Sequence, residues 1–168
     1  MLAYSIGKFI SSLATIFNRK KDADFSEYGI NVSKKYTYKT KVYYEDTDAG
    51  GVVFYANYLK YIERGRTEYL RDLGFEQGSL AKQHGMVFVV KSVSADYLSP
   101  AYLDDVIEVQ TSIDLIKNAS LVFAQKILNI EKNTVLFKAE VKVVSVMKNN
   151  LKPCAFPQEI LEKLNGRK

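Results

Sequence analysis

"YYEDTDAGGVVFYANYLKYIERGRTEYLRDLG", residues 43–74, runs from an acidic cluster through a glycine pair into a helical pattern. Apolar residues and one glycine recur there at three- and four-residue spacing, which predicts a helix from Asn57 to Leu73 with one buried face. Gly74 is a natural stop, because glycine readily adopts the left-handed conformation that ends many helices. The predicted buried face consists of Tyr58, Ile62, Gly65, Tyr69 and Leu73.

Alternating apolar and polar residues predict five strands around this helix. One strand precedes the helix, within residues 34–45, and four follow it, within residues 86–98, 105–117, 120–131 and 134–147. Turn residues at 117–118 and 132–133 indicate successive hairpins, so we expect the four later strands to form an antiparallel meander. Shorter helices are expected at 78–84 and next to Pro157.

This order of elements indicates an α+β fold in which a five-stranded antiparallel sheet wraps around one long helix. That arrangement is the hotdog pattern. We expect residues 34–168 to form this single domain, because a chain of 168 residues with 47% hydrophobic content suits one core.

Residues 1–33 are expected to form an N-terminal extension. Its first part, residues 1–21, has apolar residues at helical spacing followed by a basic cluster, and residues 22–33 look like a linker. The pattern predicts an amphipathic helix that docks on the body or on a partner subunit, or one that lies on an anionic membrane surface. It is too short and too broken for a transmembrane span, and it lacks the features of a signal peptide.

Charge and composition exclude several classes of function. Of the net charge of +5, residues 1–35 contribute +3, from six basic and three acidic residues, so the body is nearly neutral. A broad nucleic-acid surface is therefore not expected. The single cysteine, Cys154, and the single histidine, His84, cannot build a disulfide or a structural zinc site. The lone cysteine suits a reducing compartment, so we expect a cytoplasmic protein without a metal or cofactor.

The acids before the helix suggest chemistry as well as capping. A helix start exposes unpaired N–H groups and carries about half a positive charge, so it can stabilise an oxygen that becomes negative during acyl transfer. Gly50 and Gly51 lack side chains, so a substrate can approach the backbone closely. Asp48 can loop back toward the helix start near Tyr55, which would give hydrolysis of a thioester or ester without a histidine.

At these residues the chain resembles the YbgC-like acyl-CoA thioesterases of the Tol-Pal envelope system. These belong with the 4-hydroxybenzoyl-CoA thioesterase family, whose fold is the hotdog fold. The resemblance covers roughly residues 36–157. Besides residues 43–74, it includes FVV at 88–90, YLSPAYLDD at 97–105, SLVFAQKI at 120–127 and AEVKVV at 139–144.

The resemblance implies an acyl-CoA thioesterase that acts on small to medium acyl groups. It places the catalytic aspartate at Asp48, as nucleophile or as general base, and the backbone oxyanion donor at Tyr55. Many YbgC-like proteins have a histidine at the latter position. Asn57 and Tyr58 end the signature and are candidate substrate-binding residues, although Asn57 is also a candidate helix cap and Tyr58 a candidate core residue.

The resemblance also implies partners. The substrate would be acyl-CoA, and the chain would form a homodimer or homotetramer with active sites between subunits. The phosphates of coenzyme A need basic side chains, and four candidates cannot be separated by sequence: Arg66, Lys91, Lys126 and Lys142.

Other functions compete with hydrolysis. The extension allows an alternative in which the chain is a scaffold for envelope or lipid-synthesis proteins with vestigial activity. Residues 1–21 would then contact the inner face of the membrane or an envelope protein. A hotdog dehydratase is disfavoured, because no histidine stands at the helix start.

Overall fold

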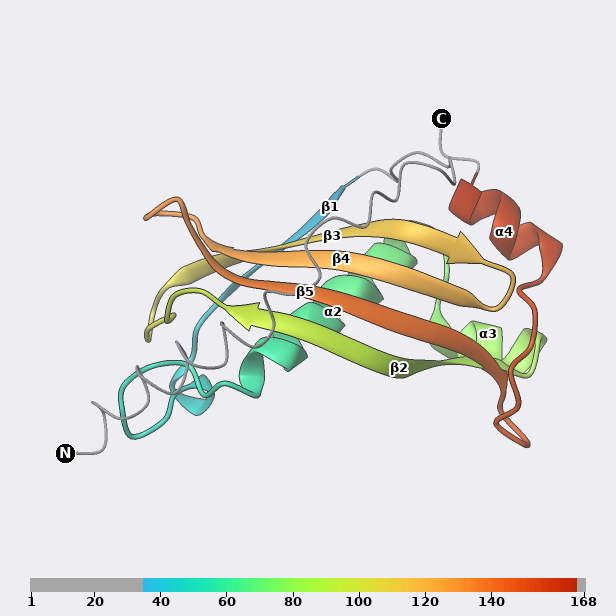
Figure 1. The fold of residues 1–168 in the computed structure, drawn as a ribbon, viewed down its shortest axis with the longest axis horizontal. Coiled ribbons are helices and arrows are strands. Elements are labelled where there is room, and N and C mark those ends of the chain that lie inside the picture. Colours follow the sequence, from blue (N-terminus) through green and yellow to red (C-terminus); the bar gives the residue numbers. More distant parts are fainter. Residues whose placement is uncertain (1–34, 166–168) are drawn as a thin grey trace, which may run out of the picture. The chain divides into compact units, whose positions relative to one another are not determined.

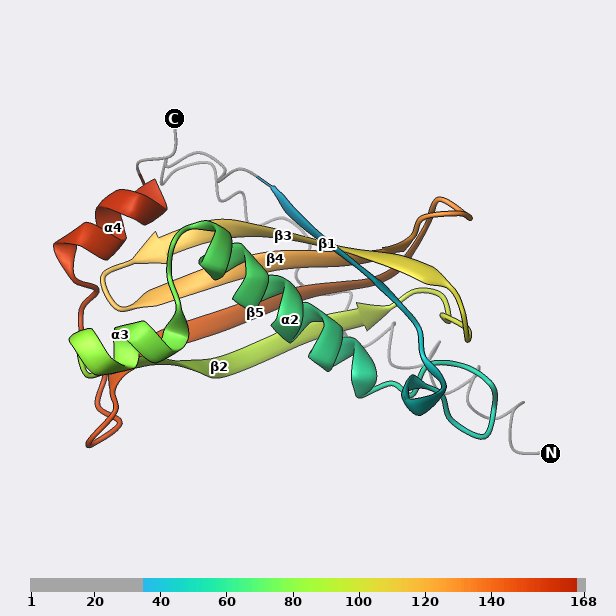
Figure 2. The same cartoon turned by 180° about the vertical axis from the view of Figure 1, so that it is seen from behind.

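A computed structural model describes residues 35–165, which form one five-stranded antiparallel sheet in the order β1-β3-β4-β5-β2. Helix α2 (Asn57–Asp72) lies across one face of this sheet, as Figures 1 and 2 show from opposite sides. The predicted sheet around one long helix is therefore confirmed. The strands are β1 (Tyr36–Lys41), β2 (Met86–Tyr97), β3 (Val106–Lys117), β4 (Ser120–Asn129) and β5 (Thr134–Met147).

The predicted meander of four strands is wrong at β2. Strands β3, β4 and β5 do form successive hairpins, but β2 pairs with β5 at the edge opposite β1. Short turns force neighbouring strands to pair, whereas residues 98–105 make a longer link that contains Pro100. That link lets the chain cross from one edge strand to the interior of the sheet, which the alternation pattern alone cannot reveal.

Shorter helices complete the described part of the chain. They are the 3-10 turn η1 (Tyr44–Asp46), α3 (Gln77–Gln83) and α4 (Gln158–Asn165). Within residues 35–165 no helix is long and apolar enough to cross a membrane. The predicted extension, residues 1–33, lies outside the described residues, so its helix and its membrane contact stay predictions.

The middle of α2 comes very close to the sheet at Gly65. A Cβ atom built at Gly65 would lie 2.7 Å from Val109 Cγ1 and 3.1 Å from Thr111 Oγ1. All five residues of the predicted helix face are buried, which confirms the periodicity argument. Tyr61 and Arg66 are buried as well, and the sequence did not predict this.

A polar clasp holds this contact. Gln125, buried on β4, donates from Nε2 to the carbonyl of Ile62 at 2.9 Å and to Thr111 Oγ1 at 2.8 Å. Its Oε1 accepts a hydrogen bond from Arg66 Nη1 at 2.8 Å. Because buried polar groups need partners, the clasp fixes where along the sheet α2 can sit.

Replacing Gly65 by alanine should destabilise the fold. The new methyl group would force β3 and α2 apart, and we expect a loss of about 1–3 kcal/mol in the free energy of unfolding. The gain in helix propensity, about 1 kcal/mol, offsets only part of this strain. Urea unfolding measures the change.

Gly78→Ala is the matched control, since a Cβ atom at Gly78 in α3 would meet no atom within 4 Å. It should leave stability unchanged or raise it. A Gly65→Ala protein as stable as the control would show that α2 does not depend on this close approach.

Candidate active site

A tight hairpin carries the acidic cluster and its glycines. Thr47 pairs with Val53, and the amide of Asp48 donates to the carbonyl of Val52 at 2.9 Å. Gly51 closes the turn by donating to the carbonyl of Asp48 at 3.0 Å, with a φ of 74°. Such a positive φ favours glycine, so the second glycine of the motif is a requirement of the turn.

Asp48 is exposed at the tip of this hairpin, with one carboxyl oxygen held in place. The amide of Gly50 donates to Asp48 Oδ1 at 2.8 Å, and a Cβ atom at Gly50 would lie 3.0 Å from the same oxygen. Among residues 35–165, Oδ2 of Asp48 has no hydrogen-bond partner. A carboxyl group oriented through one oxygen, with the other exposed, can act as a base or as a nucleophile.

Asp46 ties the hairpin to the helix start. It is buried, and its Oδ2 accepts a hydrogen bond from the amide of Tyr43 at 2.9 Å. Its carbonyl accepts from the amide of Phe54 and from Asn57 Nδ2, both at 2.9 Å. Asp46 therefore bonds within the turn and also reaches α2.

The start of α2 is not capped as expected. Ala56 occupies the N-cap position and no side chain caps the helix, because the Asn57 amide group donates to Asp46 instead. The prediction that Asn57 caps the helix is therefore wrong. Asn57 is buried and fixes the angle between hairpin and helix.

Two backbone donors are left at this helix start. The carbonyl of Phe54 accepts from the amide of Asn57 at 2.8 Å, but within the described residues no hydrogen bond engages the amides of Tyr55 or Ala56. The Tyr55 side chain is exposed. An unpaired N–H group at a helix start is suited to bind an oxygen that carries negative charge.

Tyr58 lies in the core beneath the hairpin. Burial raises the pKa of its hydroxyl, and the hydroxyl oxygen accepts a hydrogen bond from the amide of Ala101 at 2.9 Å. The carbonyl of Ala101 in turn accepts from the amide of Val53 at 2.9 Å. Tyr58 thus supports the hairpin through the loop of residues 98–105.

The same loop has its own anchor. Asp105 Oδ2 accepts from the amide of Tyr102 at 2.9 Å, and Asp105 Oδ1 accepts from Lys132 Nζ at 2.9 Å. Burial acts to raise the pKa of Asp105, but the hydrogen bonds from Lys132 and Tyr102 outweigh it and hold the pKa below its usual value. The loop under the hairpin is therefore well fixed.

The structure thus gathers the predicted residues into one region, at the end of the sheet where the loop between η1 and α2 lies (Figure 1). Asp48 and Tyr55 are exposed there, whereas Asn57 and Tyr58 are buried. Two residues that sequence reasoning missed are Ala101 and Tyr97, whose hydroxyl donates to the carbonyl of Tyr55 at 3.1 Å. Both lie far away in the sequence, and their only signal was the match of residues 97–105 to a family pattern.

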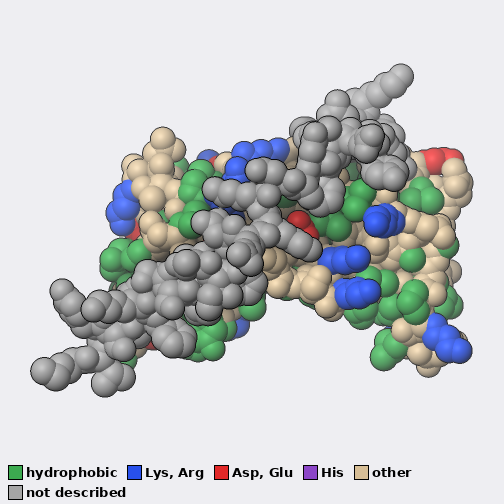
Figure 3. Space-filling model, viewed as in Figure 1, with side chains coloured by type: hydrophobic (Ala, Val, Ile, Leu, Met, Phe, Trp, Pro, Cys, Tyr) green, Lys and Arg blue, Asp and Glu red, His purple; other side chains and the backbone are tan. Residues whose placement is uncertain are grey.

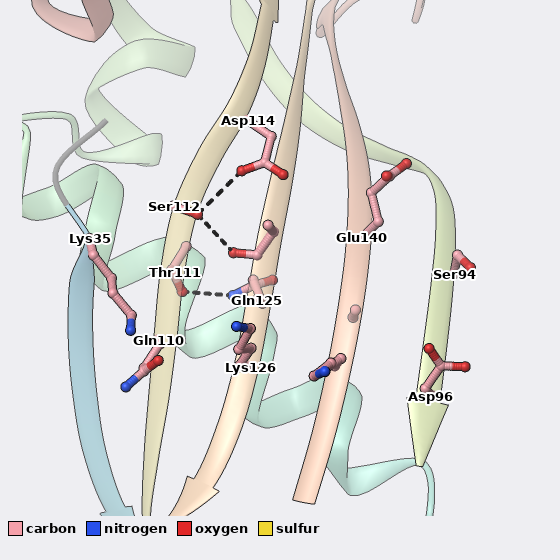
Figure 4. A pocket seen from close by; sticks show the side chains of 13 residues that line it. Lys35, Ser94, Asp96, Gln110, Thr111, Ser112, Asp114, Gln125, Lys126 and Glu140 are labelled. Atoms are coloured by element: carbon pink, nitrogen blue, oxygen red, sulfur yellow. Dashed lines mark hydrogen bonds between the residues drawn. The ribbon is translucent and has the colours of Figure 1, made fainter. Parts of the chain in front are cut away.

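A separate hollow of about 510 Å³ lies on the sheet face opposite α2 (Figure 4). It is lined by polar side chains, among them Gln110, Ser112, Lys126 and Lys138, and by neither Asp48 nor Tyr55. Figure 3 shows lysine and arginine side chains at several places on the visible part of this face.

The sequence offered four basic candidates for binding the phosphates of coenzyme A. Arg66 is excluded from this role because it lies inside the molecule. Its guanidinium is buried and bonded to Gln125, and burial lowers the pKa of Arg66. Lys126 lines the hollow on the opposite face. Lys91 is exposed on the edge strand β2.

Comparisons with known proteins give a family match and several relatives. Residues 42–164 match the model of the thioesterase-like superfamily. The chain is 45% identical over 126 residues to the acyl-CoA thioesterase YbgC of Haemophilus influenzae, covering 74% of this chain and 90% of that protein. It is 47% identical over 126 residues to the acyl-CoA thioester hydrolase YbgC of Escherichia coli, covering 75% of this chain and 92% of that protein. A probable thioesterase from Bartonella henselae superposes with a TM-score of 0.70 at 34% identity, covering 74% of this chain and 100% of that one.

Removing the Tyr58 hydroxyl should loosen the hairpin support. Tyr58→Phe leaves the amide of Ala101 without its acceptor in a buried place, and we expect a loss of about 1–3 kcal/mol in the free energy of unfolding. Urea denaturation is the measurement. Tyr44→Phe serves as control, because Tyr44 is 82% exposed. Equal stability of the two variants would contradict the role assigned to Tyr58.

Proposed function

The chain belongs to the thioesterase-like superfamily and is an acyl-CoA thioesterase, and we propose that Asp48 is its catalytic carboxylate. The observation that carries this proposal is the pairing of an exposed, oriented carboxyl group with unpaired amides at the adjoining helix start. We propose small to medium acyl groups as substrates, with coenzyme A as the thiol that leaves.

The reaction needs one attacking group and one oxyanion donor. Either the Asp48 carboxylate attacks the thioester carbon and water later cleaves the acyl-enzyme, or Asp48 takes a proton from a water that attacks directly. In both routes the carbonyl oxygen becomes negative and accepts a hydrogen bond from the amide of Tyr55. The positive end of the α2 dipole adds to this stabilisation. The products are a carboxylic acid and a thiol.

Asp48→Ala should abolish most of the turnover. Loss of a nucleophile or general base is expected to lower kcat by about 10²-fold or more. The measurement is thiol release from a panel of acyl-CoA substrates that differ in chain length. Glu45→Ala is the matched control, since Glu45 is an exposed acid three residues away and should leave kcat unchanged. Equal rates for Asp48→Ala and wild type would remove Asp48 from the mechanism.

We also propose that a second copy of the chain encloses the site. Strand β2 is an edge strand, and its valines Val89, Val90 and Val93 are exposed. A long apolar edge is an aggregation hazard unless another strand covers it. Pairing of β2 with β2 of a second copy would bury these valines and bring the partner beside Tyr97, at the end of the same strand.

Val93→Asp should then break the assembly. A carboxyl group at this edge would be desolvated on pairing, so we expect the mass measured by light scattering to fall to that of one chain, with kcat/KM falling alongside. Thr37→Asp on β1, the opposite edge, should keep both. An unchanged mass for the Val93→Asp protein would rule out β2 as the contact.

A further inference from the structure

The carbonyl of Tyr55 lies just before α2, outside the hydrogen bonds of the helix. Ala56 is the N-cap, so the regular bonds between residues four apart begin at the carbonyl of Ala56. Here the amide of Leu59 donates to the carbonyl of Ala56 at 3.2 Å. The carbonyl of Tyr55 accepts instead from the hydroxyl of Tyr97, at 3.1 Å. A side chain from the distant strand β2 therefore binds a carbonyl that the helix itself leaves without a donor.

The hydrogen bond from Tyr97 bears on the peptide groups next to the proposed oxyanion site. The Tyr55 amide belongs to the peptide whose carbonyl is that of Phe54, and the Ala56 amide belongs to the peptide whose carbonyl is that of Tyr55. Both carbonyls are hydrogen-bonded, to Asn57 and to Tyr97, while both amides lack a partner among residues 35–165. Hydrogen bonds to a carbonyl polarise its peptide group and strengthen the N–H on the other side as a donor.

Tyr97 is well placed to hold this geometry. Its ring packs edge-on against Tyr58 and Phe137, with centroid distances of 5.5 and 5.0 Å, so the position of the hydroxyl is set by the core. Burial and the nearby Tyr55 raise the pKa of Tyr97. The hydroxyl therefore stays protonated near neutral pH and can donate.

We propose that Tyr97 is a positioning residue of the oxyanion site: its hydroxyl holds the carbonyl of Tyr55, and this orients the amide of the same peptide, that of Ala56, as a donor beside the amide of Tyr55. The proposal rests on the proposed thioesterase function. Negative charge on the substrate oxygen is greatest in the transition state, so donors held in place lower the barrier more than they tighten substrate binding.

Tyr97→Phe removes one hydroxyl and keeps the ring packing. We expect kcat for acyl-CoA hydrolysis to fall roughly three- to tenfold, with KM little changed, because a single positioning hydrogen bond is lost. The matched control is Tyr102→Phe, since Tyr102 is 47% exposed, close to the 42% of Tyr97, and its hydroxyl donates no hydrogen bond within the described residues. The control should keep wild-type kcat, and thermal unfolding should match for all three proteins.

A second measurement does not depend on turnover. In a nitrogen-labelled sample, the backbone amide resonance of Ala56 should move upfield in Tyr97→Phe, because its peptide loses the polarising hydrogen bond, and should stay in place in Tyr102→Phe. An unmoved resonance, or a kcat for Tyr97→Phe equal to wild type, would overturn the proposal. A rise in KM at constant kcat would do the same.

Failure of the proposed function has a different signature. A wild-type protein that releases no thiol from any acyl-CoA would overturn the thioesterase assignment, and the Ala56 resonance would then decide alone whether Tyr97 holds the helix start. A different result would reject only the positioning role of Tyr97. In that case the wild-type protein is active, the Asp48→Ala protein is inactive and the Tyr97→Phe protein keeps wild-type kcat, so the thioesterase function is retained.

Discussion

The close approach of α2 to the sheet at Gly65 is the constraint on which the described fold depends. With no side chain there, the helix comes within reach of β3 and β4, and Gln125 bonds both to Thr111 and to the helix carbonyl at Ile62. These bonds are buried, so any sliding of α2 along the sheet would leave polar groups without partners. Because the middle of α2 is fixed against the sheet, the position of its N-terminal end is fixed as well.

The site is built outward from that helix start. Asp46 connects the acidic turn to the helix start. Its carbonyl accepts hydrogen bonds from the Phe54 amide and the Asn57 side chain, and its carboxyl group accepts one from the amide of Tyr43. Asp46 also faces the buried hydroxyl of Tyr61, whose pKa is raised by burial and by this carboxyl group, although no well-aligned hydrogen bond joins the two. One acid of the cluster thus holds the backbone, whereas Asp48 is left exposed.

Burial gives Arg66 a structural role in place of the binding role that its residue type suggests. By type it is a natural ligand for the phosphates of coenzyme A, yet its guanidinium lies against Gln125 inside the molecule and no carboxylate is bonded to it within residues 35–165. A buried cation is costly unless it is well hydrogen-bonded, so its role here is to complete the clasp under α2.

The sequence by itself determined the long helix, its buried face, the five strands, the hairpins between β3, β4 and β5, and the acidic turn with its two glycines. These features follow from local periodicity and turn chemistry, which act over a few residues. Tertiary structure alone decided that β2 crosses to the far edge, that Asn57 bonds to Asp46 instead of capping its helix, and that Tyr97 meets the carbonyl of Tyr55. Tyr97 and Tyr55 are 42 residues apart, and only the packing of α2 against the whole sheet brings such pairs together.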